Sequence, residues 1–202
     1  LGGIDYMAAA LSDICSNPAN GTVGERPTTT AAQIAERVYG AMTCDGRTII
    51  GIRDGSSNTI LLIEDAGRAH PQVSTFGANA SNGRLSALNS PANAMTSPAA
   101  NARRVFAWAD PDAATNGISG PSNSTGSRQA RVNNSSNPIG GPTTCPWSTN
   151  NCGPNDEPFA FHSGGVNCVL ADGSVRFMRD SISPLTLKFL TGAEDGQTVS
   201  ID

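Results

Sequence analysis

The feature that most constrains the fold of this chain is an alternating apolar pattern near its carboxyl terminus. The pattern occupies residues 159–178 and reads FAFHSGGVNCVLADGSVRFM. It contains two dipeptides, Gly164-Gly165 and Asp172-Gly173, that are typical of two-residue hairpin turns. Side chains alternate between the two faces of a strand, so this pattern predicts a three-stranded antiparallel meander.

Two-residue turns at both places fix which residues face one another. Across the second turn Leu170 faces Val175, and across the first turn His162 faces Asn167. The large apolar side chains then share one face, which we predict to be buried. That face consists of Phe159, Phe161, Cys168, Leu170, Val175 and Phe177, with Cys168 as a buried unpaired thiol.

The same register keeps the histidine and the aspartate of this segment apart. Asn167, opposite His162, and Asp172 are separated along the central strand by roughly 16 Å at ~3.3 Å per residue. A metal-binding or catalytic pair has to approach within a few ångströms, so His162 and Asp172 cannot form one site. We therefore predict structural roles in this motif for His162, Gly164, Gly165, Asn167, Asp172 and Gly173.

The rest of the chain divides into a structured first part (1–70) and a loop-rich middle (71–157), followed by the closing part (158–202). Residues 48–52 (TIIGI) and 59–64 (TILLIE) are predicted strands, because both are rich in β-branched residues. The intervening RDGSSN has turn chemistry, in which Asp54, Gly55 and Asn58 take structural roles. In the middle part, residues 103–110 are the one good strand candidate, between long ordered loops.

Two segments have helical features. In residues 29–42, Ile34, Val38 and Met42 are spaced by four, which fits a short helix; the alternative is a loop that leads into a strand at 38–43, because Gly40 interrupts the pattern.

The second segment is residues 183–192, where Ser183 is a predicted N-cap, Pro184 the first helical residue and Gly192 the stop. Its predicted apolar stripe consists of Ile182, Leu185 and Phe189. Residues 196–202 are a candidate edge strand.

These elements predict a single α+β domain that is mainly β. It consists of an antiparallel sheet with a carboxy-terminal three-stranded meander, one or two short helices and long ordered loops. The chain has 202 residues, enough for one domain with its own core.

Composition excludes several classes of function. Only 15% of the residues are charged and the net charge is −4, so the chain lacks the basic surface that nucleic-acid binding requires. It contains no nucleophile elbow, phosphate-binding loop, dinucleotide fingerprint or zinc-protease motif. We predict no enzyme activity.

Five cysteines leave at least one thiol unpaired within the chain. Cys145 and Cys152 flank a short polar loop and are the first candidates for a disulfide, with Cys15–Cys44 as the second. A disulfide requires an oxidising compartment, which together with the neutral polar surface favours an extracellular, cell-surface or periplasmic location.

Two loops carry oxygen ligands of the kind that calcium prefers. The alternative is that these side chains are solvated turn residues. The two candidate ligand sets are Asp110, Asp112 and Asn116, or Asn155, Asp156 and Glu157.

His162, nine residues and then Asp172-Gly173 resemble the signature of the prepilin-type processing-associated H-X9-DG proteins, the planctomycete-type DUF1559 family. The segment DGSSNTILLIEDAGR (54–68) is similar to a second block of that family, and WADPD (108–112) and NNSSNPIGGP (133–142) also resemble one of its branches. The resemblance covers most of the chain.

The resemblance implies a globular head of a pilin-like or type II secretion pseudopilin-like protein. Such proteins carry an amino-terminal prepilin helix, which this chain lacks and through which alone we expect membrane contact. The expected role is a structural filament subunit whose partners are like subunits. Related heads often hold calcium in a carboxy-terminal loop. The alternative function is an extracellular solute- or glycan-binding module that uses Trp108 or Trp147.

Overall fold

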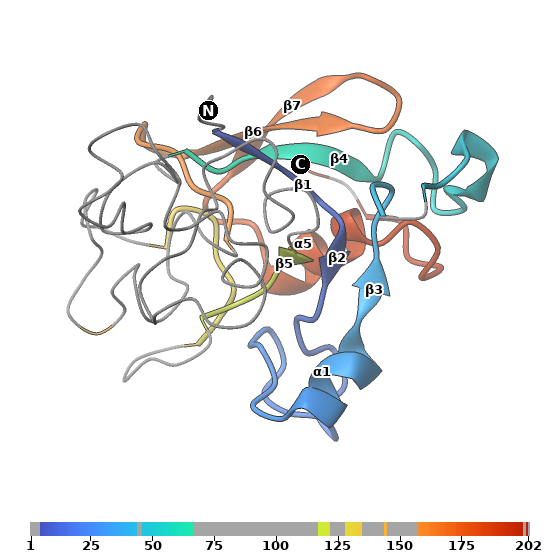
Figure 1. Cartoon of the computed structure of the whole chain (residues 1–202). Coiled ribbons are helices and arrows are strands. Elements are labelled where there is room, and N and C mark those ends of the chain that lie inside the picture. Colours follow the sequence, from blue (N-terminus) through green and yellow to red (C-terminus); the bar gives the residue numbers. More distant parts are fainter. Residues whose placement is uncertain are drawn as a thin grey trace, which may run out of the picture.

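The computed structural model of the chain describes residues 5–43, 46–66, 117–121, 128–134, 144, 157–199 and 201. Within these residues the fold is mixed α+β with more strand than helix, as predicted (Figure 1). A four-stranded antiparallel sheet consists of β1 (Tyr6–Ala8), β4 (Ile60–Glu64), β6 (Gly165–Leu170) and β7 (Val175–Arg179), in the order β1-β4-β6-β7. A three-stranded mixed sheet, β3-β2-β5, consists of β3 (Val38–Tyr39), β2 (Leu11–Ser12) and β5 (Gly117–Ile118). The helices of the described residues are α1 (Thr30–Glu36), α5 (Pro184–Thr191) and the 3₁₀ turn η1 (Ile49–Gly51).

The β6–β7 hairpin confirms the second predicted hairpin, but its register differs by one residue. Val169, not Leu170, lies opposite Val175, and Asn167 lies opposite Phe177. The two-residue turn was therefore a wrong prediction. The loop has three residues, and in it the Gly173 N–H donates to the Leu170 carbonyl at 2.9 Å.

The reason for the longer turn lies in its last two residues. Gly173 has a φ of 84°, which suits the glycine that closes a three-residue hairpin loop. The carboxylate of Asp172 accepts a hydrogen bond from the Ser174 N–H at 2.8 Å. An Asp-Gly pair supports both turn lengths, so the pair alone does not settle the register.

The changed register reverses the faces of β7. Met178 now lies opposite Val166, and both side chains are fully buried. Val175 and Phe177, which we expected in the core, are 66% and 49% exposed. The four-stranded sheet therefore has a buried inner face and an outer face with exposed apolar side chains.

The first arm of the predicted meander does not pair with β6. Instead β6 pairs with β4, with Cys168 opposite Ile63. The segment before β6 runs beside the end of β4, where the Phe159 N–H donates to the Glu64 carbonyl at 3.1 Å. Gly165 is the first residue of β6 and not a turn residue. Glycine is needed there because an added Cβ would overlap the Met178 carbonyl. Consequently Phe159 is buried as predicted, whereas Phe161 is 54% exposed.

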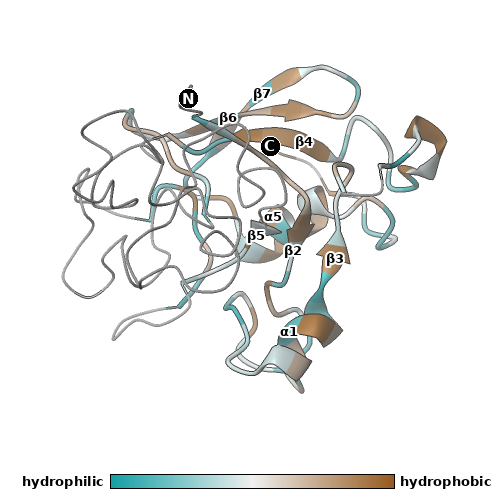
Figure 2. Cartoon of the chain, in the orientation of Figure 1, coloured by the Kyte–Doolittle hydropathy of each residue, from teal (hydrophilic) through white to brown (hydrophobic). Residues whose placement is uncertain are grey.

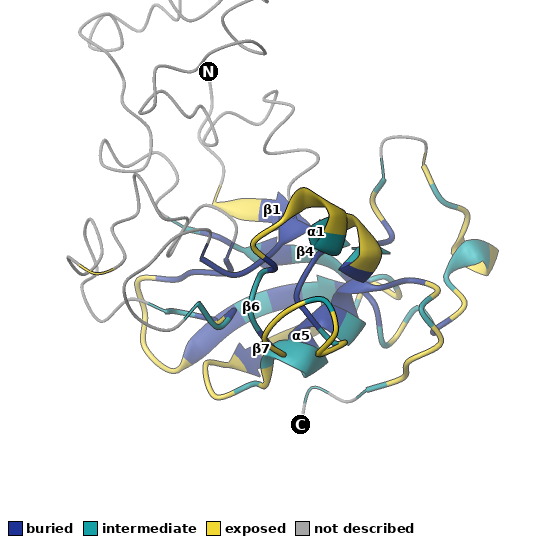
Figure 3. Ribbon diagram, turned by 90° about the horizontal axis from the view of Figure 1, so that it is seen from below, coloured by how far each residue is buried: buried dark blue, intermediate teal, exposed yellow. Residues whose placement is uncertain are grey.

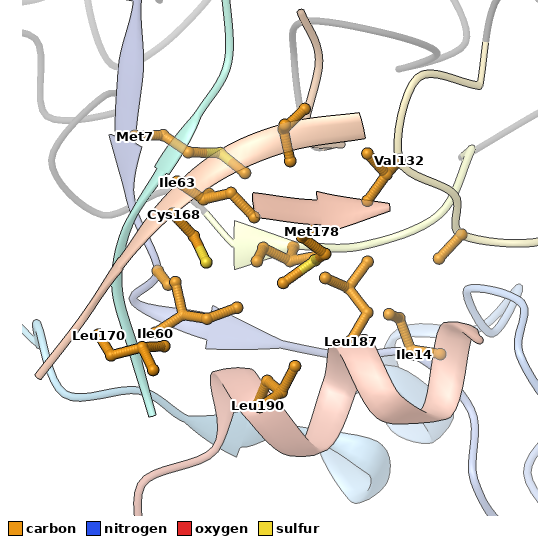
Figure 4. Close-up of a cluster of buried hydrophobic side chains, with 14 of the residues drawn as sticks. Met7, Ile14, Ile60, Ile63, Val132, Cys168, Leu170, Met178, Leu187 and Leu190 are labelled. Atoms are coloured by element: carbon orange, nitrogen blue, oxygen red, sulfur yellow. The ribbon is translucent and has the colours of Figure 1, made fainter. Parts of the chain in front are cut away.

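The core lies between the inner face of the four-stranded sheet, the small sheet and α5 (Figure 4). α5 contacts β2, β3, β4 and β5. Its predicted ends are confirmed: the Ser183 hydroxyl accepts from the Thr186 N–H, and the helix stops at Gly192. The predicted stripe is confirmed for Ile182, which packs against the core, but it is wrong within the helix. There Leu187 and Leu190 are the buried apolar residues, not Leu185 and Phe189. Cys168 is a buried free thiol of the core, as predicted.

The first part of the chain contains both alternatives considered for residues 29–42. α1 ends at Glu36, and β3 begins at Val38 (Figure 1). Figure 3 shows α1 mainly in yellow, as a mostly exposed helix. The strand predicted at 59–64 is confirmed as β4. The strand predicted at 48–52 is wrong: Ile49–Gly51 forms η1, and none of its residues is buried. The candidate edge strand at the carboxyl end does not form in residues 196–199.

Candidate functional site

The outer face of the four-stranded sheet carries a transverse row of aromatic and polar side chains. Tyr6 lies opposite Glu64 in the β1–β4 pair, and Asn167 lies opposite Phe177 in the β6–β7 pair. Hydrogen bonds between Glu64 and Asn167 join the two pairs. Cross-strand partners share a face of the sheet, so these four residues form one row, which we call the Glu64 row.

Glu64 is the centre of this row. Its Oε2 accepts hydrogen bonds from the Asn167 backbone N–H at 2.9 Å and from Asn167 Nδ2 at 3.1 Å. His162 Nε2 lies 3.2 Å from the same oxygen. The Glu64 side chain is 14% exposed, so the carboxylate is fixed but reaches the surface.

His162 extends the row beyond Phe177. The centroids of the two rings are 6.0 Å apart with an angle of 31° between their planes. The His162 side chain is 45% exposed. We predicted that His162 faces Asn167 across a hairpin; that ladder does not form, and the two side chains meet instead at Glu64.

Asn133 holds the segment that positions His162. Among the described residues, Asn133 is the only one other than glycine that has a positive φ, 51°. Its Oδ1 accepts from the Ala160 N–H at 2.7 Å, and its Nδ2 donates to the Gly165 carbonyl at 3.1 Å. A short amide side chain tolerates this backbone conformation and can fasten two segments at once.

Asp172 lies at the other end of β6 from His162. Its backbone N–H donates to the Ser56 carbonyl at 3.0 Å, which attaches the hairpin tip to the loop before β4. Hydrogen bonds from Ser174 lower the pKa of its carboxyl. Each residue therefore has its own partners, and the strand between them prevents a shared site.

The 54–58 block also serves the fold. The buried Asp54 carboxylate accepts from the backbone N–H groups of Asp195 and Gly196 at 2.7 and 3.0 Å. Asn58 Nδ2 donates to the Asp54 carbonyl at 3.2 Å, and Gly55 has a φ of 98°. Asp54 thus holds the carboxy-terminal loop against the loop before β4, and Gly55 and Asn58 shape the turn that carries Asp54.

A carboxyl pair forms where these two loops meet. Burial of Asp195, together with the nearby charge of Asp54, raises the pKa of Asp195 to about 6, although the Gln197 N–H opposes the shift. This pair offers only two acidic groups as possible metal ligands. Among the described residues there is no group of three or more His, Cys, Asp or Glu placed to hold a metal ion.

A second polar network lies near α5. Glu36 Oε2 accepts from Lys188 Nζ at 2.7 Å and from the Ser16 hydroxyl at 2.7 Å, and its Oε1 accepts from Asn20 Nδ2 at 2.6 Å. Burial alone would raise the pKa of Glu36, but these hydrogen bonds outweigh it and lower the pKa to about 2. The network joins the loop after Cys15 to both helices, which is a structural role.

Cys15 is a buried free thiol whose Sγ donates to the Asn17 carbonyl, so the predicted Cys15–Cys44 disulfide does not form. Cys44 and the other predicted disulfide pair lie outside the described residues. Both calcium ligand sets fall there as well, except Glu157, which is buried and accepts from the Arg131 N–H at 3.2 Å. The residues outside are Cys44, Cys145, Cys152, Asp110, Asp112, Asn116, Asn155, Asp156, Trp108 and Trp147, together with the strand predicted at 103–110.

Single motifs in the sequence do not reveal Glu64 as the centre of the site. Its signal in the sequence was a carboxylate at the end of an otherwise apolar strand, ILLIE. A charge at that place has to reach the surface or find donors, and Glu64 does both. Its donors come from a segment about a hundred residues away in the chain, which no local pattern reveals.

Comparison with known proteins found one matching family. Residues 7–185 match the model of the family described as "Protein of unknown function (DUF1559)". No curated protein and no solved structure matches the chain. In the described residues, no helix combines the length and the apolar character that a membrane crossing needs.

Proposed function

The chain belongs to the DUF1559 family, and on that premise we propose that it is the head of a pilin-like or type II secretion pseudopilin-like protein. In this role it is a structural subunit that packs against like subunits at the cell surface, in the envelope or outside the cell. The observation that carries the proposal is the exposed apolar tip at η1.

Two adjacent isoleucines form this tip. Ile49 and Ile50 are 74% and 93% exposed, and Figure 2 shows η1 as a hydrophobic turn that projects from the body of the protein. The turn is held in place, because Arg47 donates to the Gly51 carbonyl at 3.0 Å and to Glu194 at 2.9 Å. A rigid apolar projection in water is unfavourable unless another surface covers it.

The contacts made by the motif residues also favour a structural role. Asp54, Gly55 and Asn58 serve turns and loop attachment, and Asp172 and Gly173 build the hairpin turn. Residues with such roles support a scaffold, not a reaction.

Low charge permits close packing of identical subunits. Only 15% of the residues are charged, so repulsion between copies with the same net charge of −4 is weak at physiological salt. A tip that inserts into a different surface of the next copy would make a heterologous contact, and such contacts generate open filaments when the rotation does not close.

The proposal is tested by sedimentation velocity and electron microscopy of the purified chain over a range of concentrations. We expect reversible self-association that the Ile49→Ser/Ile50→Ser variant abolishes. Ile34→Ser is the matched control, because Ile34 is also an exposed isoleucine, at 60%, but lies on α1. A monomer at every concentration, or equal loss of association in the control, would contradict the proposal.

A further inference from the structure

We propose that the Glu64 row, with His162, is a binding site for an extended, neutral oligosaccharide. This inference goes beyond the filament role and uses a different surface from the η1 tip. It rests on the order of side chains along the row, which is aromatic, carboxylate, amide and aromatic.

The aromatic ends of the row suit the apolar faces of sugar rings. Tyr6 is 40% exposed and Phe177 is 49% exposed, on the two edge strands of the sheet. The His162 ring beside Phe177 enlarges that end. Exposed aromatic rings offer a large apolar area at a low cost in side-chain entropy, and the C–H groups of a pyranose lie flat on such a surface.

The polar centre of the row suits hydroxyl groups. Glu64 uses Oε2 for its three partners, so its other oxygen is the acceptor that remains for a ligand. Asn167 binds Glu64 through its amide nitrogen, which leaves its amide oxygen for the same purpose. Both side chains are already fixed by hydrogen bonds, so a ligand would lose little free energy in ordering them.

The length of the row sets the size of the ligand. The four residues come from four adjacent strands, and three spacings of about 4.8 Å give a span of about 14 Å. A ring on Tyr6 and a ring on Phe177 would therefore belong to one chain of about three sugar units, with the middle unit over Glu64 and Asn167.

The Glu64 carboxylate favours a sugar over other possible ligands of this face. A second copy of the protein that covered this face with apolar side chains would bury Glu64 without new donors, which is unfavourable. A sugar covers the aromatic rings with its C–H groups and donates hydrogen bonds from its hydroxyls to the carboxylate. A membrane surface is disfavoured as well, because the row contains no lysine or arginine.

Isothermal titration calorimetry of the full chain with cellotetraose and with chitotetraose tests the proposal. We expect the wild type to bind at least one of these probes, with binding weakened about tenfold or more in Phe177→Ala and in Tyr6→Ala. Val175→Ala is the matched control, because Val175 is on the same strand and more exposed but outside the row; it should bind like the wild type. Thermal melts confirm that the variants are folded.

Three outcomes would overturn the site: no heat with either probe at millimolar concentration, equal affinity of Phe177→Ala and wild type, or loss of self-association in Phe177→Ala with no effect of sugar. The last outcome would assign this face to a second copy. The Ile49→Ser/Ile50→Ser variant keeps the row intact, so it should lose self-association and retain sugar binding. The two proposals therefore fail separately.

Discussion

Lys188 and Glu36 form an ion pair in which each side chain is only 3% exposed, with Nζ 2.7 Å from Oε2. The pair joins the middle of α5 to the last residue of α1. The Glu36 carboxylate also accepts hydrogen bonds from the backbone N–H groups of Ser16 and Asn17. One carboxylate thus holds two helices and a loop together.

Removal of the cation should be strongly destabilising. In Lys188→Met the Glu36 carboxylate stays buried without its charged partner, so we expect a loss of about 3–5 kcal/mol in the free energy of unfolding, measured by urea denaturation. Adding Glu36→Gln to that variant removes the uncompensated charge and should recover part of the loss. If the double variant is less stable by the full sum of the single effects, the two groups are not coupled.

The hairpin turn gives a second prediction. Gly173 has a φ of 84° and nothing within 4 Å of an added Cβ, so a substitution there tests backbone conformation alone. Gly173→Ala should destabilise the protein by about 1 kcal/mol. Gly173→Asn is the control, because asparagine adopts the left-handed conformation more readily and should cost less in the same thermal melt. Equal effects of both substitutions would show that the turn has a different conformation.

Stability should fall between mildly acidic and neutral pH because of Asp195. Its pKa is raised from 3.8 to about 6 in the folded protein, so the folded state binds the proton more tightly than the unfolded state. This contribution is complete below pH 3.8 and is lost as the pH rises through about 6. In Asp195→Asn the loss should disappear from a series of melting temperatures against pH.

Glu194, the residue next to Asp195, provides the control for this series of melting temperatures. Hydrogen bonding to Arg47 lowers the pKa of Glu194, the opposite direction from Asp195. Glu194→Gln should therefore leave the decline between mildly acidic and neutral pH in place. A decline that disappears in Glu194→Gln and persists in Asp195→Asn would show that the pH dependence of stability comes from Glu194 and not from Asp195.

Thiol labelling should distinguish the core cysteines from accessible ones. Burial raises the pKa of Cys168 to about 11, and Cys15 is also buried with a raised pKa. Because the thiolate is the reactive form, iodoacetamide at pH 8 should modify neither residue before denaturation. Mass spectrometry of labelled peptides reads out each site, and rapid native labelling of Cys168 would contradict the packing of β6.

Local patterns predicted the elements whose ends are set by local chemistry. Ser183, Pro184 and Gly192 give α5 its two ends, and the apolar run of β4 has no polar residue to end it before Glu64. These features depend on hydrogen bonds and side-chain contacts within a few residues. They are visible in a single sequence for that reason.

Local sequence patterns could not predict the register of the β6–β7 hairpin or the strands that pair with β6. Both a two-residue and a three-residue loop accept Asp172-Gly173, and the difference of one residue moves Phe177 from the core to the outer face. The choice of β4 over residues 157–163 as the neighbour of β6 depends on a pairing across about a hundred residues. The Glu64 row exists only because of that distant pairing.

All strands of the larger sheet come from two stretches of chain, residues 6–64 and 165–179. Between β4 and β6 the described residues add no strand to this sheet, but they contribute β5 to the small sheet and Ala130 and Val132 to the core. The larger sheet is thus closed by the pairing of distant segments, and the entropy of loop closure grows slowly with the length between them, by only about 0.6 kcal/mol for each doubling. We therefore expect the larger sheet to tolerate changes of length between β4 and β6 that spare β5 and residues 128–134, the parts of this interval that fasten it to the core.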